Sequence, residues 1–516
     1  MVCLTKKNDT KLISEALKVL GKENLALIIH GSSFPSIDGE DTGFGTFNSK
    51  AGHSLIDYAS GIFNAIQLGP AGKTKSSDSS PYTGTIFSGN PLFIDLKQLT
   101  EKKWDSILSE STYNRVVSEN PKQNQGRTAY SYIIKAQNNA LNEAWTNFKK
   151  KEHGGILGSH LLKEFDAFKK ENSFWLENDS LYEALSIENG NDYWYSWKND
   201  TDKRLLNPKN SDEKKLFESR IKEIKTKYED EIEFYKFCQF VLEKQNEETK
   251  KYALSKGIKM IADRQVAFSD RDAWAYQSLF LDGWYLGCPP DYFSKDGQAW
   301  GFPVMDPEKM YNSDGSLGEG GVLMKNLYKK MFKENPGGVR IDHIVGLIDP
   351  WVYKAGKKPM CEDGAGRLYS SPEHPELSKY AIARNEDLDW TLEADKEKRV
   401  KTLSDEQIKL YGRLIEKIVI GAAKECGLDK NAIVCEDLGT LTNPVDAVMK
   451  KYGLQGMRLT QFVVPEKPEH PYRCKNITEN VWNMVGTHDN NPIAKWAESM
   501  INTHEGYLHA KNLRVY

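Results

Sequence analysis

The stretch Gly338-Val339-Arg340-Ile341-Asp342-His343 decides the fold, because a short apolar run here passes directly into polar side chains. Side chains alternate across a strand, so Arg340 and Asp342 share one face and His343 follows just beyond it. An arginine two residues before an aspartate keeps that carboxylate ionised and oriented, as a nucleophile requires. A buried structural ion pair explains the same triplet, so the stretch alone leaves both interpretations open.

Six similar apolar runs lie on either side of this one, and several also end in polar or charged residues. The seven runs cover residues 25–29, 62–68, 258–262, 338–341, 432–435, 457–462 and 483–485. Short continuous runs are typical of strands buried on both faces of a parallel sheet. Stretches with helical spacing, such as 405–426 and 443–452, lie between them. This alternation predicts βα units, and a parallel barrel carries its chemistry at the carboxyl ends of its strands.

Residues 99–256 interrupt the alternation. They are rich in Lys and Glu, and from residue 211 to 256 their apolar residues recur at helical intervals. We therefore predict an α/β fold, a TIM-type (β/α)8 barrel with a large helical insertion. Residues 1–98 would hold the first two strands, 99–256 a mostly helical inserted subdomain, and 257–516 strands three to seven with the active-site loops.

The carboxyl end of the chain supplies no further strand-like run. Residues 490–516 contain one expected helix at 492–501 and then a polar tail. A (β/α)8 barrel has an eighth strand and helix. We therefore expect a barrel that lacks both through truncation at the carboxyl end, with Met1 as a genuine start.

Composition and motifs argue against several classes of protein. The 70 Lys and Arg against 73 Asp and Glu give a net charge of -3, which offers no basic surface for nucleic acid. A mean hydropathy of -0.61 and an amino terminus without an apolar segment predict a cytoplasmic protein without a membrane span or signal peptide. Seven cysteines without C-x-x-C spacing suggest reduced thiols. Without nucleotide-binding, zinc or serine-hydrolase motifs, we expect no metal and no cofactor.

Three other strand ends carry carboxylates. Glu436 and Asp437 are adjacent, so alternation sends only one of them into a shared site. Glu436 among aromatic residues would have a raised pKa and suit general acid catalysis, whereas Asp437 is equally well interpreted as a helix cap. His488 and Asp489 belong to a polar cluster that follows a strand, and this cluster is interpreted equally well as a simple turn without a role in a site. Asp263 belongs to an Asp-Arg pair, which is commonly structural.

Two aromatic segments complete the candidate site. Residues 287–301 hold three aromatics between prolines and glycines, which predicts a loop facing a ligand, although aromatics can also simply anchor a loop to the surface. Tyr82 follows the small-residue stretch 71–79, and such a tyrosine is often a packing residue. Aromatic faces suit the flat faces of sugar rings.

Together these features resemble the 4-alpha-glucanotransferases called amylomaltases or disproportionating enzymes, glycoside hydrolase family 77. The matching blocks follow the family's order at residues 67–70, 80–82, 88–91, 174–176, 289–301, 340–343, 435–439, 456–458 and 486–490. The resemblance implies an alpha-amylase-type barrel with inserted subdomains, and alpha-1,4-glucan donors and acceptors as partners. Ile344-Val345 departs from the aromatic residue and arginine that usually follow the aspartate-histidine pair, which bears on substrate length more than on reaction type.

The resemblance also implies roles for individual residues. Asp342 matches the catalytic nucleophile, Glu436 the general acid/base, and Asp489 the carboxylate that stabilises the transition state. The expected substrate-binding residues are Arg340, His343, His488, Tyr82, Asp291, Tyr292, Phe293, Trp300 and Asp263. The implied reaction is a retaining transfer through a covalent glucosyl-enzyme, with the two carboxyl groups about 5–5.5 Å apart. An alpha-glucan hydrolase and a catalytically inactive glucan-binding protein remain the alternatives.

Overall fold

The structure is a computed structural model, which describes residues 6–123, 125–155, 158–291, 294–439 and 441–514. The chain divides into two compact units. Unit 1 comprises Met1–Ser14, Asn24–Met260 and Ala267–Phe280, and unit 2 comprises Glu15–Glu23, Ile261–Val266 and Leu281–Tyr516.

Unit 1 contains the first predicted strands. β1 (Ala26–Ile28) pairs in parallel with β2 (Ala65–Gln67). β3 (Lys259–Arg264) begins in the same unit, where the Lys259 backbone N–H donates to the Asn64 carbonyl. The buried apolar runs therefore form strands where the sequence predicts them.

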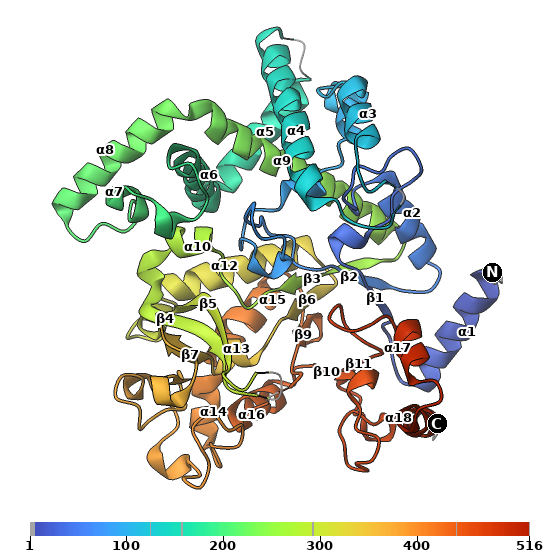
Figure 1. Cartoon of the computed structure of the whole chain (residues 1–516), viewed down its shortest axis with the longest axis vertical. Helices are drawn as coiled ribbons and strands as arrows, with labels where there is room; N and C mark the ends of the chain where they lie inside the picture. Colours follow the sequence, from blue (N-terminus) through green and yellow to red (C-terminus); the bar gives the residue numbers. More distant parts are fainter. Residues whose placement is uncertain (1–5, 124, 156–157, 292–293, 440, 515–516) are drawn as a thin grey trace. The chain divides into compact units, whose positions relative to one another are not determined.

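The rest of unit 1 is mainly helical (Figure 1). Helix α1 (Lys6–Val19) begins the described chain, and only its residues up to Ser14 belong to unit 1. The others are α2 (Lys50–Ala59), α3 (Glu110–Ser118), α4 (Tyr130–His153), α5 (Ser159–Glu171), α6 (Ser173–Glu188), α7 (Asp200–Lys203), α8 (Ser211–Lys227), α9 (Glu229–Ser255) and α10 (Asp270–Ala275). The long helix α9 packs against α4, α5 and α6. Its first turn holds three acidic residues, which favour a helix amino terminus.

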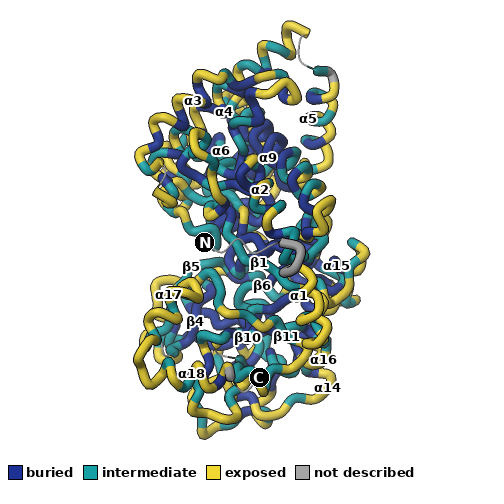
Figure 2. The backbone as a smooth tube through the Cα atoms, turned by 90° about the vertical axis from the view of Figure 1, so that its right-hand side faces the viewer, coloured by how far each residue is buried: buried dark blue, intermediate teal, exposed yellow. Residues whose placement is uncertain are grey.

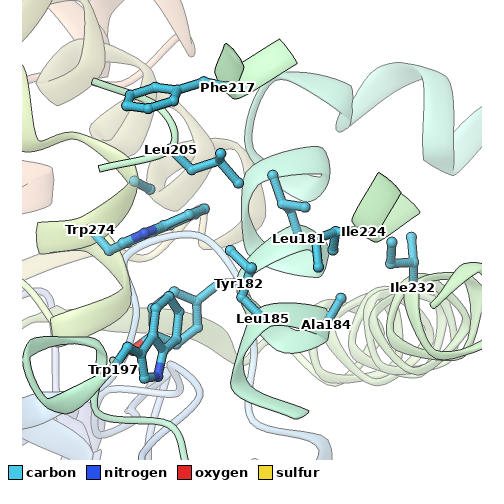
Figure 3. Close-up of a cluster of buried hydrophobic side chains, with 11 residues drawn as sticks. Leu181, Tyr182, Ala184, Leu185, Trp197, Leu205, Phe217, Ile224, Ile232 and Trp274 are labelled. Carbon is cyan, nitrogen blue, oxygen red and sulfur yellow. The ribbon is translucent and has the colours of Figure 1, made fainter. Parts of the chain in front are cut away.

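A large aromatic cluster holds α6, α8 and α10 together (Figure 3). The centroid of the Tyr182 ring lies 5.3 Å from that of the Trp274 ring and 5.2 Å from that of the Trp197 ring. Trp274 and Trp197 are each 1% exposed. The indole N–H of Trp274 donates to the Asp202 carbonyl at 2.8 Å, so this buried polar atom is satisfied.

Unit 2 contains the parallel strands that carry the predicted carboxylates. β6 (Gly338–Ile341) lies between β3 and β9 (Ile433–Cys435), and all three run in parallel. β10 (Gly456–Leu459) and β11 (Val481–Met484) form a second parallel pair. Each of the seven predicted runs overlaps an observed strand, so the placement of these strands is confirmed.

An antiparallel sheet in unit 2 was not predicted. Its strand order is β5 (Gln298–Met305), β4 (Phe280–Cys288), β7 (Trp351–Lys354) and β8 (Gly366–Arg367). The prediction of a loop over 287–301 is wrong at both ends, because β4 runs to Cys288 and β5 begins at Gln298. β4 and β5 mix exposed and buried positions and lack the continuous apolar run used to find the parallel strands, and β7 and β8 are only four and two residues long.

The helices of unit 2 agree in part with the prediction. They are α11 (Pro307–Met310), α12 (Glu319–Glu334), α13 (Val345–Ile348), α14 (Asp405–Tyr411), a π-helical turn (Ile415–Ile420), α15 (Gly421–Glu425), α16 (Asn443–Tyr452), α17 (Ile493–Met500) and α18 (His504–Arg514). Helices were expected at 443–452 and 405–426, and the π-helical turn interrupts the second. The polar tail expected after residue 501 is wrong, because α18 occupies it.

The described residues after β11 contain helices and no strand. Figure 2 shows α17 largely exposed, whereas β6 of the same unit is buried. In the part of the chain that the structure describes, no helix is long and apolar enough to cross a membrane.

Candidate active site

Arg340 connects two carboxylates at the end of β6. Its Nη1 donates to Asp263 Oδ1 at 2.8 Å and to Asp342 Oδ1 at 2.7 Å. The side chains of Arg340 and Asp263 are 3% and 0% exposed, whereas that of Asp342 is 20% exposed. Asp263 is therefore the buried ion-pair partner, and Asp342 is the carboxylate that Arg340 orients toward accessible space. The structural ion pair is thus present in the Arg340–Asp263 contact, and the nucleophile role of Asp342 stays a prediction.

Glu436 directly follows β9 and is fixed by two backbone donors. Its Oε2 accepts from the His343 N–H at 2.9 Å, and its Oε1 accepts from the Leu438 N–H at 2.7 Å. Burial raises the pKa of Glu436 to about 7; the Arg340 charge opposes this rise and the Asp342 charge adds to it. The predicted rise is confirmed. A carboxyl group with such a pKa can both donate and accept a proton near neutral pH.

His343 links the nucleophile candidate to the acid/base candidate. Its φ of 46° is unusual for a residue other than glycine, and strained backbone of this kind is concentrated at functional sites. The backbone N–H of His343 donates to Glu436, while its ring meets the Trp300 ring edge-on with centroids 5.0 Å apart. Burial lowers the pKa of His343 to about 4, against the opposing charge of Asp342. The imidazole is therefore neutral at pH 7.

Asp437 makes different contacts from Glu436, as the alternation predicts. Its Oδ1 accepts from the Met457 N–H at 2.7 Å, and its Oδ2 accepts from Arg458 Nη1 at 2.8 Å. The side chain is 2% exposed. Asp437 therefore connects the end of β9 to β10, and the helix-cap interpretation is wrong.

Asp489 lies in a more open environment than Asp342 and Glu436. Its side chain is 77% exposed and pairs with His488, with Nε2 and Oδ2 3.2 Å apart. The backbone N–H of Asp489 donates to Thr487 Oγ1, and the Thr487 N–H donates to Asn490 Oδ1. These bonds form a turn that follows β11. The catalytic role of Asp489 stays a prediction.

The predicted aromatic loop lies between β4 and β5. In its described part, Asp291 Oδ1 accepts from the Ser294 N–H at 2.7 Å. Tyr292 and Phe293 lie outside the described residues. Trp300 belongs to β5, where it packs with the cluster of Trp284, and it reaches His343 as described above. Trp300 is thus fixed by a strand.

Tyr82 belongs to unit 1, whereas the candidate carboxylates belong to unit 2. It lies in the 3-10 turn Pro81–Thr83, with its ring 6.0 Å from the His30 ring. No group of three or more His, Cys, Asp or Glu side chains among the described residues is arranged to hold a metal ion.

Sequence reasoning missed Arg367 on β8. Its side chain is buried, at 3% exposed, and its guanidinium centre lies 5.5 Å from the Trp351 ring centroid. Its charge contributes to the lowered pKa of His343, after the larger effect of burial. No signal in the sequence marks it, because β8 has only two residues and belongs to the unpredicted sheet.

Comparison with known proteins adds independent evidence. A family model of glycoside hydrolase family 77, described as 4-alpha-glucanotransferase, matches residues 29–514. The 4-alpha-glucanotransferase of Clostridium butyricum is 26% identical over 91% of this chain and 81% of that protein. The 4-alpha-glucanotransferase of Thermus thermophilus is 28% identical over 91% of this chain and 79% of that protein.

Solved structures agree with this match at the level of the fold. The structure of amylomaltase from Streptococcus agalactiae in complex with acarbose has a TM-score of 0.70 and 20% identity, and the match covers 96% of this chain and 85% of that chain. Amylomaltase from Corynebacterium glutamicum has a TM-score of 0.63 and 17% identity, covering 97% of this chain and 61% of that one.

Proposed function

The chain belongs to the 4-alpha-glucanotransferases of glycoside hydrolase family 77, enzymes that transfer segments of alpha-1,4-glucans, and we propose that it does so by a retaining double displacement. The observation that carries this mechanism is the pair of Asp342, held by Arg340, and Glu436, whose pKa is about 7. We further propose that the helical residues 99–256 are an insertion into an alpha-amylase-like barrel.

In the first step, a carboxylate oxygen of Asp342 attacks the anomeric carbon of the donor glucan. The bond between that carbon and the glycosidic oxygen breaks, and Glu436 gives its proton to the departing oxygen. The product is a covalent glucosyl-enzyme ester on Asp342. The bond from Arg340 Nη1 orients the Asp342 carboxylate for this attack.

In the second step, Glu436 acts as a base. It accepts the proton of the 4-hydroxyl group of an acceptor glucan, whose oxygen then displaces Asp342 from the anomeric carbon. The pKa near 7 suits both steps, because the protonated and ionised forms are both populated near neutral pH. The backbone N–H groups of His343 and Leu438 hold the carboxyl group in one orientation throughout.

The remaining predicted residues are proposed to bind sugar. Asp489 and His488 would hold hydroxyl groups of the reacting glucose and stabilise the transition state. Tyr82 would stack on a glucose ring. His343 and Trp300 would form part of the wall of the subsite, and their edge-on contact supports this proposal. Asp291, Tyr292 and Phe293 would guide the acceptor chain, while Asp263 acts through Arg340.

Incubation with maltotriose tests transfer against hydrolysis. Transfer produces maltopentaose and longer chains at a constant number of reducing ends, whereas hydrolysis produces glucose and maltose and raises that number. We expect longer chains, and their loss in Asp342→Asn. A rise in reducing ends without longer chains would identify an alpha-glucan hydrolase, and no products at all would indicate a glucan-binding protein.

A further inference from the structure

Asp437 joins two sheets of unit 2 directly beside the acid/base candidate. β9 lies at one edge of the five-stranded parallel sheet, whereas β10 belongs to the separate pair with β11. At the end of β9, the Cys435 N–H donates to the carbonyl of Gln455, the residue before β10, at 2.8 Å. Beyond this point the connection passes to the Asp437 side chain, through its bonds to the Met457 N–H and to Arg458.

The shape of β10 admits the Asp437 carboxylate only at a glycine. A Cβ atom at Gly456 would lie 2.8 Å from Asp437 Oδ1 and closer still to Oδ2, so any other residue would push the carboxylate away from its two donors. The cation of the pair is fixed as well, because the Arg458 guanidinium centre lies 5.3 Å from the Tyr472 ring centroid. Charge, hydrogen bonding and shape therefore hold Asp437 in one position.

The residue after Asp437 supplies a donor to Glu436. The Leu438 N–H donates to Glu436 Oε1 at 2.7 Å. The Leu438 side chain packs against a buried apolar cluster formed by Val434, Met457 and Leu459. Apolar packing has no preferred direction, whereas the bonds of Asp437 do. Asp437 therefore sets the direction of the Leu438 N–H, and through it one of the two bonds that hold the Glu436 carboxyl group.

We propose that Asp437 and Arg458 are positioning residues, which hold the Glu436 carboxyl group where it protonates the departing glycosidic oxygen. The proposal rests on the proposed function, in which Glu436 is the general acid/base. Both residues act through the Leu438 N–H and need no contact with the sugar. When their contact is lost, the bond from the His343 N–H alone fixes the carboxyl group, which can then turn away from the reacting oxygen.

Two donors of the same maltosyl group separate proton transfer from the rest of the reaction. Maltotriose releases glucose, whose oxygen needs a proton from Glu436, whereas alpha-maltosyl fluoride releases fluoride, which leaves without a proton. Both form the same maltosyl-enzyme on Asp342. The kcat/KM for release of glucose or fluoride reports the steps up to that intermediate. A variant with a misplaced acid therefore loses rate on maltotriose and keeps it on the fluoride.

Three variants disturb the Asp437 carboxylate by different routes. Arg458→Met removes its cation, Asp437→Asn its charge and Gly456→Ala its space. We expect each to lower kcat/KM about 10–100-fold on maltotriose and at most about twofold on the fluoride, and Arg458→Lys to recover part of the loss. The control Arg220→Met removes the cation of a similar pair in unit 1, in which Asp202 is 1% exposed and 2.9 Å away, and should change neither rate.

Equal losses on the two donors in the folded variants would overturn the proposal, as would unchanged rates on maltotriose. Arg458→Lys, the mildest change, applies the same criteria if the other variants do not fold. Glu436→Gln is the reference for a lost acid and should lose rate mainly on maltotriose. Equal losses on both donors in Glu436→Gln would contradict the proposed function, whereas a selective loss there but not in the Asp437 and Arg458 variants would overturn the positioning role alone.

Discussion

The burial of Glu436 predicts a specific dependence of stability on pH. Burial raises its pKa from the ordinary 4.5 to about 7. The folded state therefore holds a proton that the unfolded state has released between these two values, and stability falls as the pH rises through this range. The Glu436 contribution is fully present below pH 4.5 and is lost above pH 7. The whole effect corresponds to about 3 kcal/mol.

The variant Glu436→Gln removes this titration. Relative to the wild type, we expect its free energy of unfolding to rise by about 3 kcal/mol between pH 4 and pH 8. The altered bonds to the His343 and Leu438 N–H groups cost the same at both values, so they cancel in the comparison. Transfer activity should fall by about 10²–10⁴-fold.

Urea unfolding of both proteins at pH 4 and pH 8 measures the difference, with Glu466→Gln as the control at an exposed glutamate of unit 2. The control should show no such change between the two pH values. An equal difference between wild type and Glu436→Gln at pH 4 and pH 8 would refute the argument that Glu436 is buried with a raised pKa.

Two further substitutions test the charged contacts. Arg340→Met removes the cation from the buried Asp263, so we expect the free energy of unfolding measured in urea to fall by about 3–5 kcal/mol. Because Arg340 lowers the pKa of Glu436, the same variant should move the alkaline limb of the kcat/KM profile to higher pH. An unmoved limb would contradict the coupling. Lys73→Met removes a cation 2.7 Å from Glu183; burial opposes ionisation of Glu183, but the Lys73 and Arg271 charges outweigh it and hold its pKa at about 2. The stability that ionised Glu183 contributes is present above pH 4.5 and is lost as the pH falls toward 2. Lys73→Met should therefore lower the free energy of unfolding by about 1–2 kcal/mol at pH 7 and by little at pH 2. Equal losses at the two pH values would refute the argument that Lys73 lowers the pKa of Glu183.

The sequence predicts the parallel strands of the fold well, because burial on both faces leaves a continuous apolar run in each. Glu436 and Asp342 could be placed at strand ends for the same reason, and alternation correctly separated Glu436 from Asp437. The partner of Asp437 could not be predicted, since Arg458 reaches it only through the position of β10 beside β9.

Other features depend on contacts between distant parts of the chain. The strand that holds Trp300 lacks a continuous apolar run, so its segment was predicted as a loop. Arg340 was known to precede Asp342, but its second bond, to Asp263, depends on the register of β3 against β6. Nothing in residues 191–197 distinguishes the buried Trp197 from the exposed Tyr195, because the difference lies in which side of the segment meets the core.

The central claim, that Asp342 forms a covalent bond to the donor sugar, is tested most directly by trapping the intermediate. A fluorinated alpha-glucosyl fluoride transfers its sugar to the nucleophile quickly, and the resulting glycosyl-enzyme ester breaks down slowly. Mass spectrometry of peptides then locates the added sugar. The mechanism predicts the added mass on the peptide that contains Asp342, and none in Asp342→Asn. A label on another carboxylate, or no label on a chain that still redistributes maltotriose, would contradict it.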